Sequence, residues 1–168
     1  MKKAFIILFI LLAGIANISF AQAPKFGHID IQQLITVMPE RVTAMSEMDK
    51  TTKELEDMLT TMQTELQTMY KEFTDKQATM SDLVKQAKAD DITAKQQRIE
   101  TFRTQSEQQL QQKQQELMKP IIEKADSCIT AVAKEQGLIY VFDVNSLRYK
   151  SNQSIDCLPL VKKKMGIE

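Results

Sequence analysis

A stretch of eighty residues, from Glu40 to Lys119, contains neither glycine nor proline, although both residue types occur on either side of it. Nothing in it forces a turn or a left-handed backbone conformation, so long helical structure is expected. Its first half carries mostly apolar residues at alternating spacings of three and four, the heptad pattern of a left-handed coiled coil. These seam positions are Met45, Met48, Thr52, Leu55, Leu59, Met62, Leu66, Met69 and Phe73, continued less regularly by Met80, Leu83 and Ala87.

The heptad pattern breaks at residues 87–91, where Asp90 or Asp91 is expected to cap a second helix. A looser apolar stripe then runs from Ile92 to Val132, and Pro120 is expected to bend this second arm. The two arms, residues 39–87 and 91–136, are nearly equal in length. This equality favours an antiparallel hairpin, with a single uninterrupted rod in a parallel bundle as the alternative.

The first twenty-one residues have the composition of a secretory signal peptide. Lys2 and Lys3 precede an apolar run over residues 4–18, and Ala21 and Ala23 offer two cleavage sites. An uncleaved membrane anchor is the alternative, but the run is shorter than the ~20 apolar residues of a spanning helix. The sequence therefore predicts an exported protein, periplasmic in a cell with an outer membrane.

Charge and composition argue against several classes of function. Removing the signal peptide takes away Lys2 and Lys3 from 22 basic residues and leaves the 22 acidic residues, a net charge of about −2. A nearly neutral chain gives no support for nucleic-acid binding, which needs a basic patch. The lysines at 162–164 are expected to form the solvated face of a last helix, with contact to an anionic membrane surface left open.

The sequence offers little for catalysis. His28 is the single histidine, so a metal cluster or a histidine-based triad has few residues to draw on, and His28 is expected to be structural. No glycine-rich phosphate loop is present in the sequence. We therefore expect a protein that is not an enzyme and that holds no cofactor or metal.

Residues 22–39 and 120–168 lie outside the long helical stretch and are expected to form a small α+β body. Strands are predicted at residues 25–30, 138–142 and 147–150. Short helices are predicted after Asp30, which has Gln33 at capping-box spacing, and after Ser154 or Asp156. So small a body with so few strands is marginally stable alone, so it is expected to oligomerise.

A few side chains outside the seam are candidates for contacts or cross-links. Met58 and Tyr70 fall just off the seam and are the candidate contacts with another molecule. Residues 105–115 include seven glutamines, which form either a soluble exterior or a contact face. Cys128 and Cys157 are permitted to form a disulfide in an exported protein, and a free buried Cys128 is equally compatible with the sequence.

The order of these features resembles the Skp/OmpH family of periplasmic chaperones over the whole mature chain. The resemblance is carried by the signal peptide, residues 25–30 (KFGHID), 114–121 (QQELMKPI) and 137–143 (GLIYVFD), and the short last helix around Pro159. It implies a jellyfish-shaped homotrimer in which strands of three subunits form a shared barrel. Residues 22–39 and 120–168 would form the trimerisation body and residues 40–119 the tentacle. The residues expected in the intersubunit barrel are Ile29, Ile31, Ile139, Val141 and Phe142.

The resemblance further implies an ATP-independent holdase that keeps unfolded outer-membrane β-barrel proteins soluble in a cavity between the tentacles. Well-known members of the family are strongly basic, whereas this chain is nearly neutral. Electrostatic capture of clients and lipopolysaccharide binding are therefore not carried over. The alternative function is a structural spacer or an adaptor coiled coil of an envelope complex, although an adaptor normally flanks its hairpin with larger β domains and an anchor.

Overall fold

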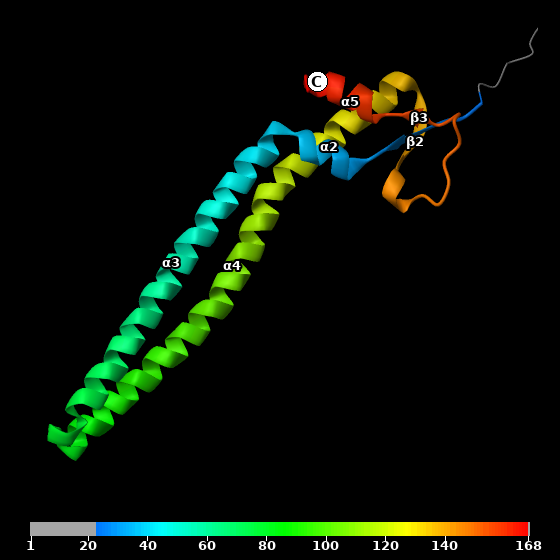
Figure 1. Cartoon of the computed structure of the whole chain (residues 1–168). Coiled ribbons are helices and arrows are strands. Elements are labelled where there is room, and N and C mark those ends of the chain that lie inside the picture. The colour runs from blue at the N-terminus through cyan, green and yellow to red at the C-terminus, as the bar shows by residue number, and fades with distance from the viewer. Residues whose placement is uncertain (1–22, 168) are drawn as a thin grey trace, which may run out of the picture.

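The computed structural model describes residues 23–167, so the predicted signal peptide at residues 1–21 lies outside the described part. A long two-helix hairpin projects from a small body that contains a three-stranded sheet (Figure 1). This confirms the prediction of a mainly α fold with a long antiparallel hairpin and a small β part. The elements are β1 (Lys25–Ile29), α2 (Ile31–Val37), α3 (Pro39–Lys76), η1 (Gln77–Thr79), α4 (Asp82–Gln136), β2 (Leu138–Asp143), η2 (Val144–Ser146), β3 (Ile155–Asp156) and α5 (Leu158–Met165).

The turn of the hairpin lies earlier in the chain than the sequence pattern predicts. The predicted break at residues 87–91 is wrong, because Asp90 and Asp91 lie inside α4. The chain reverses through η1 and two extended residues, Met80 (φ −83°, ψ 145°) and Ser81 (φ −67°, ψ 158°). Both have negative φ angles, so the turn needs no glycine or proline and leaves no composition signal. Leu83, expected to continue the seam, is 80% exposed at the tip.

The two arms of the hairpin run side by side along the whole of α3. Helix α3 has 38 residues, and α4 runs antiparallel to it from Asp82 as far as Lys124, which pairs with Glu40 near the start of α3. Helix α4 continues through Pro120 without a break and enters the body. The long α4 therefore belongs to both parts of the molecule and joins them as one continuous helix.

Apolar side chains between the arms form the seam. Leu55 on α3 and Ile92 and Ile99 on α4 are buried there. At the base of the hairpin the buried residue is Ala44, whereas Met45, expected in the seam, is exposed. The prediction for Met45 is therefore wrong, because the seam shifts by one residue where α3 meets the body.

The sheet has the strand order β2-β1-β3, and both pairings are parallel. The strand predicted at residues 147–150 is wrong, since that segment is irregular and β3 pairs with β1 instead. The backbone explains the choice: beyond β3, the Cys157 amide donates to the His28 carbonyl at 2.8 Å, which extends the pairing along β1. A register irregularity at the start of β1 places both Leu138 and Val141 near Gly27.

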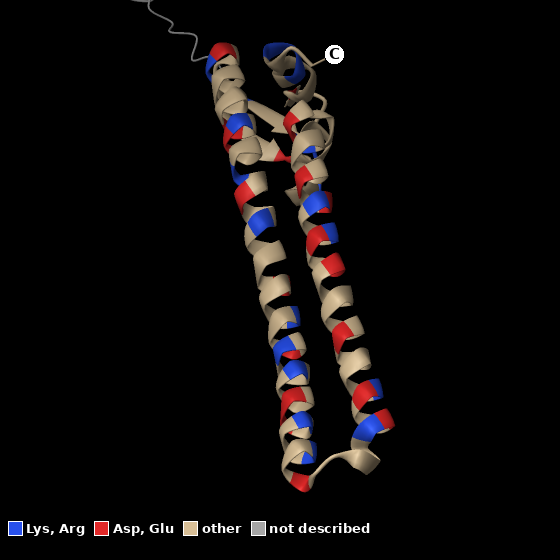
Figure 2. Cartoon of the chain, turned by 90° about the vertical axis from the view of Figure 1, so that its left-hand side faces the viewer, with Lys and Arg blue, Asp and Glu red and all other residues tan. Residues whose placement is uncertain are grey.

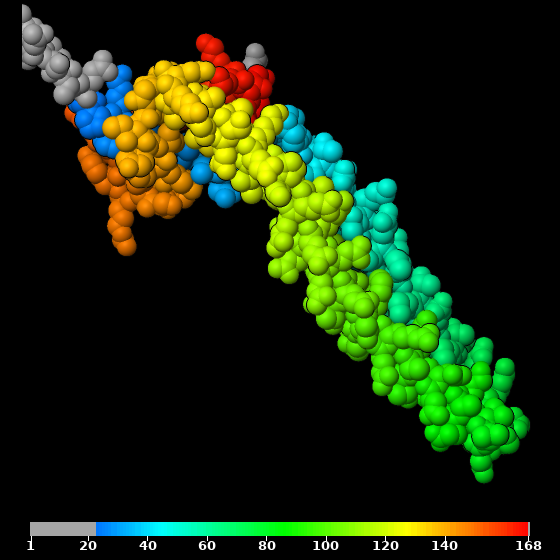
Figure 3. Space-filling view, turned by 180° about the vertical axis from the view of Figure 1, so that it is seen from behind, coloured from blue at the N-terminus to red at the C-terminus, as the bar shows by residue number. Residues whose placement is uncertain are grey.

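Helices cover one face of this sheet and form the core of the body with it. Ile29 on β1, Leu34 on α2, Ile121 on α4 and Val161 on α5 are all buried in a single cluster. The predicted cap at Asp30 is confirmed, since its Oδ1 accepts a hydrogen bond from the Gln33 amide at 2.9 Å. A space-filling view shows the body at one end and the hairpin extending away from it (Figure 3).

We predict that Ile99→Ala lowers the free energy of unfolding of the hairpin by roughly 2–4 kcal/mol, because it opens a cavity in the seam. Leu83→Ala is the matched control, since it removes a side chain of similar size at an exposed position and should change stability by less than about 0.5 kcal/mol. Urea unfolding followed by helical circular dichroism measures both variants. Equal losses from the two variants would contradict the assignment of the seam.

We predict that Gly27→Ala destabilises the body by about 1–3 kcal/mol through overpacking. A Cβ at Gly27 would lie 2.7 Å from both Cys157 Sγ and Leu138 Cδ1. Thermal unfolding of Gly27→Ala, alone and combined with Cys157→Ala, tests this cause. The cost of the added methyl should be smaller in the Cys157→Ala background, and an unchanged cost would show that the sulfur does not create the crowding.

Candidate functional site

The face of the sheet opposite the helices carries a row of aromatic rings. The rings of Phe26 and Tyr140 are stacked with centroids 6.3 Å apart and an interplanar angle of 2°. The ring of Phe142 follows at 5.8 Å from that of Tyr140. All three side chains are exposed, so the sheet presents an apolar face to the solvent. We call this surface, formed by Phe26, Tyr140 and Phe142, the aromatic face.

His28 lies on the same side of the sheet but is buried beneath the segment that precedes β3. Its Nδ1 lies 2.9 Å from Ser154 Oγ, and Lys150 Nζ lies 3.0 Å from its Nε2. Because a lysine ammonium only donates, Nε2 accepts and the proton of the neutral ring is on Nδ1. His28 therefore fastens this segment to β1, which is a structural role.

The five residues predicted for an intersubunit sheet do not share one surface. Ile139 and Phe142 are exposed on β2 and Val141 is half-buried, whereas Ile29 is 1% exposed in the core and Ile31 is half-buried at the start of α2. The sequence prediction did not include Phe26 and Tyr140, whose exposed rings lie beside Phe142 on the aromatic face. The irregular pairing near Ile139 reverses the alternation of the strand, so simple period-two reasoning assigns the side chains to the wrong face.

The residues predicted for the hairpin seam all lie on α3. Leu55 is buried, and the others are half-buried. Half-burial is what a seam between two helices produces, and no third helix within residues 23–167 covers this one. The half-buried positions are Met48, Leu59, Met62, Leu66, Met69 and Phe73.

One broad side of the hairpin is held together by ion pairs between the arms. Glu40, Glu47 and Glu65 follow one another on α3 after 7 and 18 residues, which are about two and five helical turns. Each of these glutamates pairs with a lysine of α4. We call this side the ion-paired face, and its pairs are Glu40–Lys124, Glu47–Lys113 and Glu65–Lys95. Figure 2 shows that charged residues of both signs occur along both arms.

The pair at the base of the hairpin perturbs its carboxylate. A hydrogen bond from Lys124 holds the pKa of Glu40 below its ordinary value, helped by a backbone hydrogen bond at Glu40 and by the lysine charge, and opposed by burial. The carboxylate is therefore ionised at neutral pH. Its contribution to stability is lost only as the pH falls through this lowered pKa.

The other broad side of the hairpin is joined by a neutral contact, in which Gln96 Nε2 donates to the Tyr70 hydroxyl at 2.7 Å. Gln63 lies two turns before Tyr70 on α3, and Gln114 lies five turns after Gln96 on α4. Met45 lies five turns before Gln63 on the same side. We call this side the glutamine face, defined by Met45, Gln63, Gln67, Tyr70, Gln96, Gln114 and Met118.

The two residues predicted to contact another molecule lie on opposite sides of the hairpin. Met58 is 53% exposed and lies two turns before Glu65, on the ion-paired face. Tyr70 is 43% exposed and belongs to the glutamine face. A molecule bound to one broad side therefore reaches only one of them.

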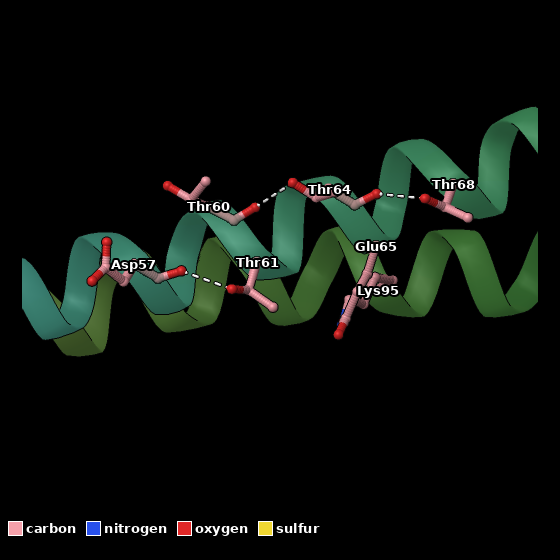
Figure 4. Close-up of polar contacts among 7 residues, drawn as sticks. All are labelled: Asp57, Thr60, Thr61, Thr64, Glu65, Thr68 and Lys95. Carbon is pink, nitrogen blue, oxygen red and sulfur yellow. Dashed lines mark hydrogen bonds and ion pairs between the residues drawn. The ribbon is translucent and has the colours of Figure 1, made fainter.

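Threonine hydroxyls along α3 are occupied within the helix (Figure 4). Thr61 donates to the Asp57 carbonyl at 2.9 Å, Thr64 to the Thr60 carbonyl at 2.9 Å, and Thr68 to the Thr64 carbonyl at 3.0 Å. Each hydroxyl has one proton, so these side chains offer acceptors and methyl groups to the solvent but no donor.

The two cysteines, both in the described part of the chain, are free. Cys157 is buried, and this burial raises the pKa of its thiol, as does the neighbouring Asp156, while a backbone hydrogen bond to His28 lowers it. Cys128 is half-buried. Cys157 is therefore a weakly reactive structural thiol that packs against Gly27.

Among residues 23–167, no group of three or more histidine, cysteine, aspartate or glutamate side chains is arranged to hold a metal ion. In the same range, no helix combines the length and the apolar character needed to cross a membrane. The lysines at 162–164 lie in the last turn of α5, where their charges complement the helix dipole, and Lys164 pairs with Glu135 at 2.5 Å.

Comparison with known proteins identifies the family. The sequence model described as "Outer membrane protein (OmpH-like)" matches residues 25–165, so the chain belongs to the OmpH-like family. Its fold is similar to that of a crystal structure named as a candidate outer membrane chaperone (OmpH-like) of Caulobacter crescentus CB15, with a TM-score of 0.75 and 13% identity. The alignment covers 85% of this chain and 84% of the other. None of the curated proteins compared with the chain matches it.

Proposed function

We propose that the mature protein is an ATP-independent periplasmic holdase that keeps unfolded outer-membrane β-barrel proteins from aggregating. Membership of the OmpH-like family supports a chaperone role. The observation that carries the proposal is the hairpin itself: its arms bury their seam against each other and leave both broad sides exposed along 38 residues. Such an arm has a large contact surface and no structural need to be covered.

The proposal includes a homotrimer assembled through the body. The aromatic face is an exposed apolar surface of the kind that marks interaction sites. Strand β2 is at the edge of the sheet, and no other strand within residues 23–167 pairs with its outer edge. Strands of neighbouring copies would cover both features at once. In the resulting assembly, residues 40–119 of three chains would surround a cavity.

The periplasmic location rests on the sequence of residues 1–21, with its basic start, apolar run and small residues at the cleavage sites. A holdase in that compartment works without nucleotide, because it needs only reversible contacts with an exposed apolar chain. Unfolded β-barrel proteins offer alternating apolar residues and unpaired strand edges, which aggregate in water. The proposed function involves no catalysis.

We predict that the unmutated protein sediments as a trimer and that Tyr140→Asp lowers the mass to that of one chain. A carboxylate at this exposed position, between the rings of Phe26 and Phe142, would lose its hydration if a second subunit covered it, and neither ring carries a compensating charge. Leu83→Asp at the exposed tip of the hairpin is the control and should leave the trimer intact. Sedimentation equilibrium over a hundredfold range of concentration measures the masses. A concentration-independent monomer for the unmutated protein would refute the assembly.

We predict that the protein suppresses aggregation of a urea-denatured outer-membrane β-barrel protein on dilution, without nucleotide and with little change between low salt and ~0.5 M salt. The insensitivity follows from near-neutral charge, because screening weakens ion pairs and leaves apolar contacts in place. Light scattering of the diluted client measures protection. Loss of most protection at high salt would show that charge dominates binding. Failure at every salt concentration, with the trimer intact, would favour the spacer or adaptor function.

A further inference from the structure

The two broad sides of the hairpin differ in chemistry. On the ion-paired face, each carboxylate that joins the arms already has a lysine partner. Covering these charges with another molecule would remove their hydration, at a cost that burial of paired charges seldom recovers. The nearby Thr61 and Thr68 hydroxyls already donate their hydrogen bonds to backbone carbonyls of α3. This face is therefore suited to water and offers little to a peptide.

The glutamine face has the opposite character. A primary amide both donates and accepts hydrogen bonds, as the N–H and C=O groups of an unpaired strand do. The side chains of Gln63, Gln67 and Gln114 form no hydrogen bond with any other residue of the range 23–167. Gln96 uses one of its two amide N–H groups in the hydrogen bond to Tyr70. Amides on this face therefore remain available to an extended backbone.

Two grooves lie on this face. The base groove, of about 290 Å³, lies where the hairpin joins the body. Its lining includes Met45, Met48, Leu117 and Met118, together with Gln114 and one charged residue, Arg41. Unbranched methionines adapt to side chains of different shapes, which suits a site that accepts many sequences.

The middle groove, of about 440 Å³, lies farther along the hairpin and is lined by Leu66 and Ile99 with Gln63, Gln67 and Gln96. Two charged residues, Glu100 and Arg103, also line this groove, and they neutralise each other at 3.1 Å. The lining of the middle groove therefore combines two apolar side chains with three amides, and its two charges cancel.

The separation of the grooves fits one kind of occupant. Met48 in the base groove and Leu66 in the middle groove are 18 residues apart on α3, which is about 27 Å along the helix. About eight residues of extended chain at ~3.3 Å each span that distance. A transmembrane strand of a β-barrel has about 9–11 residues. One such strand would reach from groove to groove.

We propose that the glutamine face binds one extended, strand-length segment of an unfolded membrane β-barrel protein. Apolar side chains of the segment enter the two grooves, and its backbone bonds to the glutamine amides between them. This inference deepens the proposed function and rests on it. It assigns client contact to Tyr70 and its neighbours and excludes Met58, which lies on the ion-paired face.

The test compares the same change of charge on the two sides of α3. Q63E/Q67E places two carboxylates on the glutamine face, where they replace amide donors with acceptors and add charge beside the grooves. T61E/T68E is the matched control, since Thr61 and Thr68 lie one turn before and one turn after Glu65 on the ion-paired side. Both variants add two negative charges to the same stretch of the same helix.

The measurement is the chaperone concentration that half-suppresses light scattering by a urea-denatured, eight-stranded outer-membrane barrel. We expect Q63E/Q67E to raise this concentration at least fivefold and T61E/T68E to change it less than twofold, with helix content and mass unchanged. Gln63→Ala combined with Gln67→Ala tests the amides without added charge and should give a loss in the same direction. This alanine variant also decides the question if Q63E/Q67E does not fold.

Two results would overturn the inference. Equal effects on both sides, or a larger effect of T61E/T68E, would show that the glutamine face is not the binding side while the holdase function stands. Absence of protection by the unmutated protein would refute the proposed function, and the inference would fall with it.

Discussion

The apolar seam between α3 and α4 is the interaction on which the rest of the molecule depends. Helix α3 has 38 residues, and most of the stability of a helix in a protein comes from packing its apolar stripe rather than from intrinsic helix propensity. Here each arm supplies the partner of the other, with Leu55 of α3 and Ile92 and Ile99 of α4 buried between them. Two helices bury the seam only in part, since most seam positions of α3 are half-buried, and both broad sides of the hairpin stay exposed.

In the body, residues 23–167 cover only one face of the sheet. Helices α2, α4 and α5 pack on the side of Ile29, and the close contact of Gly27 with Cys157 holds α5 and β3 near that face. The opposite side keeps Phe26, Tyr140 and Phe142 exposed. The hairpin is stabilised by its own seam, whereas the body leaves an apolar face of its sheet exposed. This difference favours an assembly in which copies join through the body and the hairpins stay apart.

Residue spacing along the sequence predicted the long helices and the cap of α2, but it did not predict the position of the hairpin turn or the third strand. The seam of α3 from Met48 to Phe73 follows from the heptad, and the cap at Asp30 follows from its spacing to Gln33. The hairpin turn could not be placed, because Met80 and Ser81 adopt ordinary extended angles that many residues share. The strand expected at residues 147–150 failed because β3 supplies the pairing to β1, a long-range choice that alternation does not encode.

The candidate contact surfaces were harder to predict than the fold, because they depend on which side of an element a residue lies. Met58 and Tyr70 both fall outside the heptad seam, yet seven-residue spacing to Glu65 and to Gln63 places them on opposite broad sides. On β2, the irregular pairing near Ile139 exchanges the faces of the following residues. The proposed trimer requires that the exposed edge and face of β2 be covered in solution, and hydrogen exchange of the β2 amides tests this most directly. We predict slow exchange throughout residues 138–143; rapid exchange of the amides that do not bond to β1 would show an uncovered edge and contradict the account.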